Sequence, residues 1–588
     1  MAAVGPDHPM RVTVSQPTRR SSFTPCSRRG SYRRRMTKLL PALAAAAAAL
    51  LAACTSDTDT PAGPKPRCDP ELDAALAAWA DAGFSGSVAL AAGGEPVCEA
   101  GYGAADRASG RPNTADTVFA IGSVTKTFTA AAIFDLADQG LLAPDDRVGD
   151  LLPELGGPVR DATLLQLMLH TSGLNGAAGA DHEPLSRDDA LAAIGATEPA
   201  FAPGTGYLYT NAGYTLLALV VEEIAGTSYR EHATTRILSG LPSAGFWDGS
   251  PGAVGERAIG YLDDGSTGES GDFAGPHWAL DGNGGLAMSM PDLAAWTHAL
   301  FTGGVVSAES TAAIAAPVVD LGDGAAETPG WVARDASAYG EPFLAAAGGG
   351  GDVGHDTMVV WIPSGERVIA VASNGGDVSG EELMAAIGPA LVAGDPIPAP
   401  DAPGGTFDPE AAAAIVGDYR LDTGGTYRVT HDDGLRLAAL GADAVEALFP
   451  PRDEAAADAV RTHERAVADL LAGETATGRE ELAALEDEFG PIDGAEPAGT
   501  VLAEGELRTY VTLATGDGPL LSWYALDDKG GVAAVEVGAE PPALTLVPDG
   551  DGFRPADPAG TGPDVTVTFT GDDLTVAGPD GATTARRN

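Results

Sequence analysis

A serine and a lysine three residues apart, in the stretch "GSVTKTF", have the types and spacing of a nucleophile and its base: Ser123 and Lys126. A hydroxyl is a poor nucleophile at neutral pH and needs a neighbour that takes its proton. Residues three apart on a helix share a face, so the lysine amine can reach the serine if a helix begins here. The chain contains four lysines, and Lys126 is the only one between Lys65 and Lys529. Arginine stays protonated and could not accept the serine proton, which explains a lysine at this position.

Tyr209 and Asn211 form a second candidate pair, in the stretch "YTNAGYTLLALV" between a Pro-Gly turn and a helical segment. A loop of this kind can direct side chains into a cleft. A tyrosine close to an ammonium group can have a lowered pKa and act as a general base, and the asparagine amide could donate to a substrate carbonyl. Taken singly, each pair also fits a structural role, such as a helix-capping serine with a surface lysine or a buried tyrosine with a capping asparagine.

These motifs occur together and in order, and in this the chain resembles the serine β-lactamase and penicillin-binding-protein superfamily, above all class C β-lactamases and their esterase and D-aminopeptidase relatives. The resemblance covers roughly residues 84–374 and also includes "TLLQLMLHTSGL" at 163–174 and "GNGGLAMSMPDLAAW" at 282–296. It implies that Ser123 attacks an acyl carbonyl and that Lys126 and Tyr209 share the general-base work. Asn211 would then help to hold the substrate, and His170 corresponds to a position that is usually structural.

The third element of the resemblance is where the sequence departs from it. Relatives carry Lys-Thr-Gly or His-x-Gly on the last strand of the active site, and counting back from Gly354 places this triplet on Gly348, Gly349 and Gly350. The cationic side chain is therefore missing. His355, where an aromatic residue is usual, is expected to be a loop residue, although it could also turn into the cleft and supply a charge. The backbone N–H groups of Ser123 and Gly351 are the expected oxyanion hole.

The order of elements predicts the fold. Strands are expected at both ends of the region 68–391 and helices in its middle, so that the sheet is built from both ends of the domain. The resemblance implies an α/β (α+β) fold in which an antiparallel sheet has helices on both faces and an all-helical lobe beside it. A Pro-rich linker, residues 392–405, precedes a β-rich region, 406–588, which is expected to form a β-barrel or sandwich with a charged helical interruption at about 453–489 on its surface.

The N-terminal region has the features of a targeting signal. Residues 36–54, "MTKLLPALAAAAAALLAAC", have a basic start, a short apolar run and small residues before Cys54, as in a bacterial lipoprotein signal. We therefore expect that region 1–54 is the signal, with Met36 a candidate true start, and that lipidated Cys54 anchors the protein outside the cytoplasm. Residues 55–67 would be a flexible tether.

Cysteine usage and charge narrow the function classes. Beyond the signal region only Cys68 and Cys98 remain, and an exported protein in an oxidising compartment is expected to pair them as a disulfide. The net charge of −49 disfavours nucleic acid as a partner. No metal-binding or nucleotide-binding motif is present, so no cofactor is expected.

The sequence thus predicts a serine hydrolase that forms an acyl-enzyme on Ser123 and cleaves esters or small amides. D-amino-acid peptides or β-lactams are further substrates to consider, and efficient β-lactamase activity is disfavoured because the cation is missing. The alternative is a catalytically weak, penicillin-binding-like protein that binds cell-wall peptides or senses β-lactams. The oligomeric state does not follow from the sequence.

Overall fold

The computed structural model describes residues 68–587 with short gaps. The gaps are residues 263–264, 323, 377, 401–408, 432–433, 453, 474–475, 504–505, 517, 527–530, 551, 559, 561 and 580. The expected signal region with Cys54, the tether and part of the linker lie outside the described residues. No helix in the described ranges has the length and apolar character needed to cross a bilayer.

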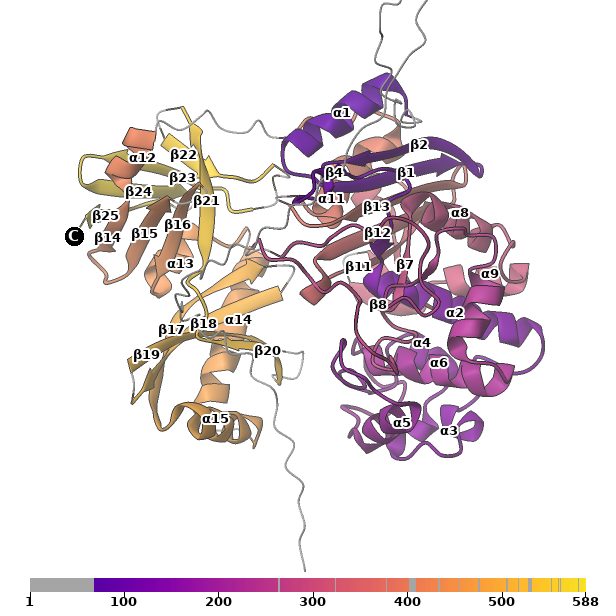
Figure 1. Cartoon of the computed structure of the whole chain (residues 1–588). Coiled ribbons are helices and arrows are strands. Elements are labelled where there is room, and N and C mark those ends of the chain that lie inside the picture. The colour runs from indigo at the N-terminus through magenta and orange to yellow at the C-terminus, as the bar shows by residue number, and fades with distance from the viewer. Residues whose placement is uncertain are drawn as a thin grey trace, which may run out of the picture.

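An eight-stranded antiparallel sheet forms the centre of the first domain (Figure 1). In spatial order its strands are β2 (Glu95–Tyr102), β1 (Gly86–Ala92), β13 (Arg367–Ser373), β12 (His355–Ile362), β11 (Phe343–Gly350), β10 (Trp331–Arg334), β9 (Ala325–Thr328) and β8 (Val319–Gly322). Strand β1 pairs directly with β13 and β2 pairs with β1, so the sheet is built from both ends of the domain, as predicted.

Helices cover both faces of this sheet (Figure 1). On one face α1 (Pro70–Asp81) and α11 (Gly380–Ala393) pack into a core with Trp79, Val371 and Leu383, while α10 (Ala336–Tyr339) lies beside α11. The other face and the lobe next to it contain α2 (Thr125–Asp138), α3 (Val148–Leu151), α4 (Leu164–Met168), α5 (Arg187–Ala196), α6 (Asn211–Ala225), α7 (Tyr229–His232), α8 (Met290–Phe301) and α9 (Ala308–Ala315). Short strands complete the domain: β3 (Ala104–Asp106), β4 (Arg111–Pro112), β5 (Phe119–Ala120), β6 (Gly245–Phe246) and β7 (Leu286–Met288).

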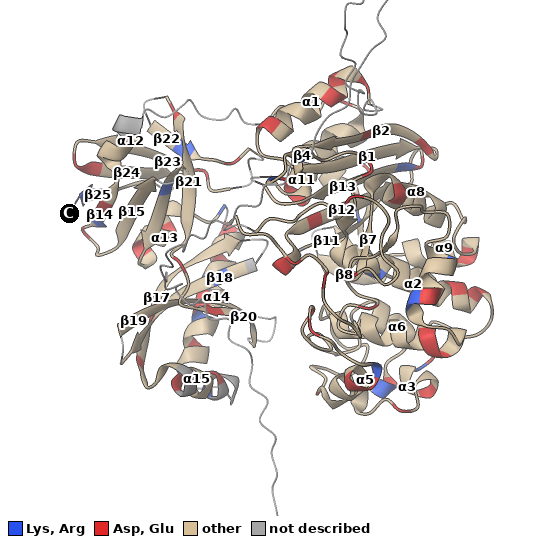
Figure 2. Ribbon diagram, in the orientation of Figure 1, with Lys and Arg blue, Asp and Glu red and all other residues tan. Residues whose placement is uncertain are grey.

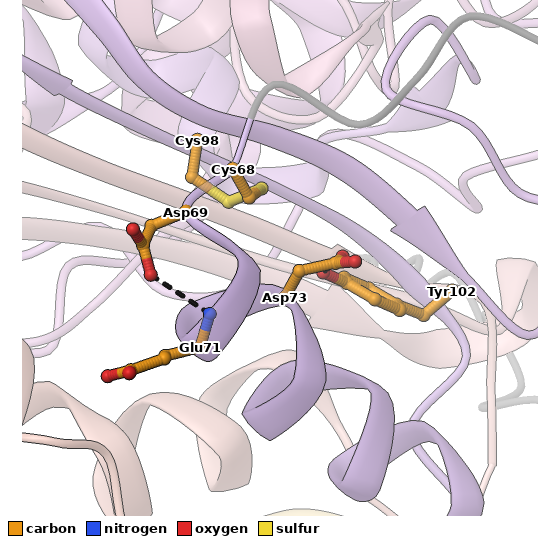
Figure 3. Close-up of a disulfide and its surroundings, with 6 residues drawn as sticks. All are labelled: Cys68, Asp69, Glu71, Asp73, Cys98 and Tyr102. Carbon is orange, nitrogen blue, oxygen red and sulfur yellow. Dashed lines mark hydrogen bonds between the residues drawn. A yellow bond between two sulfur atoms is a disulfide. The ribbon is translucent and has the colours of Figure 1, made fainter.

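The predicted disulfide between Cys68 and Cys98 is present and fastens the start of α1 to β2 (Figure 3). Next to it the Asp69 carboxylate accepts a hydrogen bond from the Glu71 backbone N–H and caps the helix. One turn further on, the Tyr102 hydroxyl donates to Asp73 at 2.9 Å. In the chain-entropy model, closing a loop of this length stabilises the fold by about 3–4 kcal/mol.

The C-terminal domain is a closed eight-stranded barrel, which decides between the barrel and the sandwich that the sequence left open. Its strands are β14 (Gly417–Leu421), β15 (Thr426–His431), β16 (Leu435–Leu440), β21 (Ala543–Asp549), β22 (Gly552–Pro555), β23 (Thr566–Thr570), β24 (Asp573–Gly578) and β25 (Gly581–Arg587). The short helices α12 (Pro409–Ile415) and α13 (Ala442–Leu448) flank it, and Val445 and Leu448 of α13 belong to the barrel core.

The helical interruption predicted at about 453–489 is present between β16 and β21 as two helices, α14 (Glu454–Leu471) and α15 (Ala476–Phe489). A four-stranded sheet follows them, which the sequence had not separated from the barrel: β17 (Ile492–Ala503), β18 (Glu506–Thr515), β19 (Gly518–Leu526) and β20 (Val532–Val537). One side of α14 is buried against this sheet, since Val467 and Leu470 pack with Leu513, and its other side is exposed.

Candidate active site

Ser123 stands in a tight turn at the beginning of a buried helix. The 3-10 turn η1 (Gly122–Val124) leads directly into α2, and Gly122 has a φ of 47°, in the left-handed region that favours glycine. Residues Thr125 to Leu136 of α2 are all buried, so this helix is surrounded by protein. The turn leaves Ser123 partly exposed at the mouth of a cleft, with the amino end of α2 behind it.

Lys126 is buried, with 3% of its surface exposed, and its amine is fixed by three oxygen atoms. Nζ lies 2.9 Å from Ser123 Oγ, 2.8 Å from Asn211 Oδ1 and 3.1 Å from the Asn283 carbonyl oxygen. Burial lowers the pKa of Lys126 to about 7, against a smaller opposite effect of nearby carboxylates. A neutral amine has two N–H groups, and the two carbonyl oxygens accept both. Its lone pair is then left for the Ser123 hydroxyl.

Tyr209 lies on the opposite side of the nucleophile, and its hydroxyl donates to Ser123 Oγ at 2.9 Å. The residue is 48% exposed, and the centre of its ring lies 4.8 Å from Lys126 Nζ. Burial raises the pKa of Tyr209 to about 12, so the expected lowering by the neighbouring ammonium is wrong. Burial of the phenol is the largest cause of this rise, because it disfavours the charged phenolate. Tyr209 is therefore a neutral phenol, able to donate a proton and to relay one.

Asn211 and His170 hold the loop that carries this tyrosine. Asn211 begins α6, and since its Oδ1 faces Lys126, its amide N–H groups are the part that can reach a substrate. His170 Nδ1 accepts from the Thr210 N–H at 3.2 Å, and its ring packs 4.4 Å from the Tyr209 ring. Burial lowers the pKa of His170 to about 3, so the imidazole is neutral. These contacts match the structural role expected for His170.

Strand β11, which ends in the glycine run, contacts the serine turn through Gly348 and Gly349, two or three residues before the predicted Gly351. A Cβ atom on Gly348 would lie 2.3 Å from the Ser123 nitrogen, so no side chain fits there. A Cβ on Gly122 would lie 3.1 Å from the Gly349 nitrogen, which puts this N–H beside the serine turn. Gly351 follows two residues later, roughly 7 Å along a strand, and begins a 3-10 turn, η4 (Gly351–Val353). The structure therefore favours Gly349 over Gly351 as a neighbour of Ser123.

The missing cation is not recovered by either placement of the motif triplet, whether the triplet begins at Gly348 or two residues earlier. If the triplet is moved back by two residues, its first position falls on Ala346, which is uncharged and buried on the α2 face of the sheet. Gly350 ends β11. His355 is not a loop residue but the first residue of β12, held between Phe119 and Trp247 with its Nδ1 accepting from the Ala120 N–H. Burial lowers the pKa of His355 to about 3, so it carries no charge.

The cleft around Ser123 has a cavity of about 170 Å³, and its lining includes three aspartates, Asp181, Asp248 and Asp352, but no lysine or arginine. Ser123, Asn211 and Gly349 line one side, and Asp181, His182 and Asp352 line another. His182 Nε2 lies 2.7 Å from Asp352 Oδ1, and this hydrogen bond raises the pKa of His182. Acidic residues also outnumber basic ones over the rest of the molecule (Figure 2). Within the described part of the chain no cluster of His, Cys, Asp and Glu side chains is suited to hold a metal ion.

Two contributors to the site escaped the sequence analysis. Asn283, whose carbonyl oxygen accepts from Lys126, lies in the "GNGGL" stretch that served only to support the family resemblance. Glu327, on β9, acts electrostatically on Lys126 although it lies about 200 residues away in sequence. No local motif marks either one, because both reach the site only through the packing of β7 and β9 against α2.

Three comparisons with known proteins found relatives of this chain. The sequence model of the β-lactamase family matches residues 74–393. Penicillin-binding protein 4* of Bacillus subtilis is 26% identical over 394 residues, covering 62% of this chain and 86% of that protein. Esterase EstB of Burkholderia gladioli is 36% identical over 186 residues, covering 26% of this chain and 47% of the esterase. Among solved structures, the octameric penicillin-binding protein homologue from Pyrococcus abyssi has a TM-score of 0.50 at 19% identity, covering 80% of this chain and 98% of that one, a likeness of fold alone.

Proposed function

Because this chain belongs to the β-lactamase family, a family of serine hydrolases, we propose that it hydrolyses esters or small amides through an acyl-enzyme on Ser123. The observation that carries the proposal is the set of three contacts at Lys126 Nζ, which place the amine so that its neutral form directs its lone pair to the serine hydroxyl. An esterase is among the relatives, and a penicillin-binding protein is another.

The proposed acylation has two steps: Ser123 Oγ adds to the acyl carbonyl, and the intermediate then collapses, so that the carbonyl forms again and the bond from the acyl carbon to the leaving group breaks. Lys126 Nζ takes the hydroxyl proton as Ser123 Oγ forms a bond to the acyl carbon, and the carbonyl electron pair moves to oxygen. The N–H groups of Ser123 and Gly349 are the proposed donors to that oxyanion. Tyr209, a neutral phenol in contact with Oγ, gives its proton to the leaving group and recovers one from Lys126. A water molecule then releases the acid by the reverse route.

The charges of the cleft support an uncharged acyl substrate over one that carries a carboxylate. Position 348 has no room for a cation, His355 is neutral, and Asp181 and Asp352 lie on the wall. A substrate carboxylate would be repelled by these aspartates, and His182 on the same wall is already hydrogen-bonded to Asp352. This property argues for esterase or amidase activity and against efficient turnover of β-lactams.

A pair of esters tests this charge preference. We expect p-nitrophenyl acetate to be cleaved with a kcat/KM at least tenfold higher than the monoester of p-nitrophenol with succinic acid, which adds a carboxylate. The difference should shrink at high ionic strength, because salt screens exposed charges. Equal or faster turnover of the charged ester would contradict the preference. Stable labelling by fluorescent penicillin without ester turnover would favour the weak, penicillin-binding alternative.

We also propose that the protein is an extracytoplasmic lipoprotein anchored through Cys54, on the strength of its lipoprotein-like signal region. Replacing Cys54 with serine should move the protein from the membrane fraction to the soluble fraction of the producing bacterium. It should also abolish metabolic labelling with a fatty acid. Cys26→Ser, which changes another cysteine of the N-terminal region, is the matched control and should leave both unaltered. Retention of the label in Cys54→Ser would refute the assignment.

A further inference from the structure

Glu327 is a buried carboxylate close to the nucleophile for which the mechanism above has no use. It lies on β9 with 5% of its surface exposed, and the Tyr207 hydroxyl donates to its Oε2 at 3.0 Å. Burying a carboxylate costs free energy unless charge or hydrogen bonds compensate. Such groups near a reactive centre are candidates for a functional role.

The packing of the β9–β10 hairpin against α2 brings Glu327 within electrostatic reach of Lys126. At the hairpin turn, a Cβ on Gly330 would lie 3.1 Å from the Lys126 carbonyl oxygen and 3.1 Å from the Thr127 Cα, so the turn rests on the first turn of α2. Tyr207 belongs to the same loop as Tyr209, and therefore the hydrogen bond to Glu327 also ties β9 to that loop. The carboxylate acts through space on both Lys126 and Tyr209.

Charged and titratable side chains from several elements face Lys126. Its ammonium group lies 4.8 Å from the centre of the Tyr209 ring and 5.7 Å from that of Tyr214. Asp181 and Glu327 both raise the pKa of Lys126, and the effect of Asp181 is the larger. His170 is neutral.

Glu327 differs from Asp181 in its surroundings. Asp181 is exposed on the cleft wall, where water and bound substrate change its field, whereas Glu327 is enclosed and less screened. Burial raises the pKa of Glu327 to about 7, while Tyr207 and Lys126 both oppose the rise. A positive charge on Lys126 and a negative charge on Glu327 therefore favour each other.

We propose that Glu327 is a positioning residue for acylation: its carboxylate stabilises the ammonium group that forms on Lys126 when the amine takes the proton of Ser123. The bond from Oγ to hydrogen breaks, the bond from Nζ to hydrogen forms, and the new positive charge interacts with the buried carboxylate of Glu327 where that group is ionised. This role rests on the proposed function, since it concerns the same proton transfer. It also predicts two opposing effects of the carboxylate. The carboxylate speeds acylation once the Lys126 amine is neutral, but it also raises the pKa of that amine and so keeps it protonated at lower pH.

The test is the pH profile of Ser123 labelling by a fluorophosphonate in Glu327→Gln. At pH 8.5 the labelling rate should fall about tenfold, because the new ammonium group loses its partner. The acid limb should move to lower pH by about one unit, since without the carboxylate Lys126 releases its proton more readily. The loss at pH 5.5 should therefore be much smaller than at pH 8.5. Asp320→Asn is the matched control: its carboxylate is exposed on the neighbouring strand β8, and its profile should match the wild type.

Tyr207→Phe serves as a second variant if Glu327→Gln does not fold. Loss of the hydroxyl donor raises the pKa of Glu327, so the acid limb should again move down, by a smaller amount. An equal loss at every pH, or an unmoved acid limb, would overturn the proposal and leave Glu327 a purely structural residue. Absence of any Ser123-dependent labelling in the wild type would instead refute the proposed function itself.

Discussion

Lys126→Arg is expected to lose about 10³-fold in the rate of acylation, within the range that general-base catalysis contributes. The substitution keeps a positive charge but removes the ability to accept a proton, since a guanidinium group stays protonated. In the wild type the active form is the neutral amine, and burial lowers the pKa of Lys126 to about 7. Its kcat/KM should therefore rise as the pH increases through about 7 and then level off. The arginine variant should lack this rise.

The larger arginine side chain could disturb a site in which Lys126 is 3% exposed, so Lys126→Met is the companion variant. Methionine fills a similar volume without charge, and it should lose as much activity while remaining folded in thermal unfolding. A Lys126→Arg enzyme that keeps its activity to within tenfold would rule out the lysine as the base. In that case Tyr209, the other group in contact with Ser123, would have to take the proton.

Gly348→Ala is the second substitution with a large expected effect, a loss of at least 100-fold in kcat/KM. Its Cβ would lie 2.3 Å from the Ser123 nitrogen and 2.6 Å from the Ile121 carbonyl oxygen. Both are backbone atoms, so strand β11 must move away from the serine turn, and a shift of this size disturbs the attack geometry. Overpacking of this kind also costs about 1–3 kcal/mol of stability, visible as a lower Tm.

A neighbouring substitution provides the control. Ala347 is exposed on the other face of β11, and Ala347→Ser should leave both activity and Tm within their errors. Gly348→Lys, which would restore the side chain found in relatives, should be as inactive as Gly348→Ala. An active Gly348→Lys enzyme that gains penicillin acylation would contradict this prediction. It would show that residue 348 is the motif position of the relatives' lysine and that β11 does not approach the serine turn too closely for a side chain.

The sequence was sufficient to predict the chemistry that depends on local spacing. Ser123 and Lys126 are one helical turn apart, so the spacing alone brings them within reach of each other, and Tyr209 and Asn211 follow from a loop of recognisable type. The split between the two domains was equally visible, because the Pro-rich stretch interrupts the pattern of strands and helices. The disulfide followed from having only two cysteines beyond the signal region.

The features that were missed depend on packing between distant segments. Counting along the sequence placed the second oxyanion-hole N–H on Gly351, whereas Gly349 lies beside the serine turn. The register of β11 against η1 depends on tertiary packing, which no local pattern records. The pKa of Tyr209 was expected to fall because an ammonium group was assumed nearby; burial of the phenol acts in the opposite direction. Glu327 reaches the site only because the β9–β10 hairpin rests on α2.

Mass spectrometry of the intact protein after brief exposure to a fluorophosphonate tests the central claim most directly. One phosphonyl group should be attached per molecule of wild type, and peptide mapping should place it on Ser123. Ser123→Ala should carry none, and Lys126→Met should be labelled about 10³-fold more slowly. A wild type that remains unmodified, or an adduct that persists in Ser123→Ala, would contradict the assignment of Ser123 as the nucleophile.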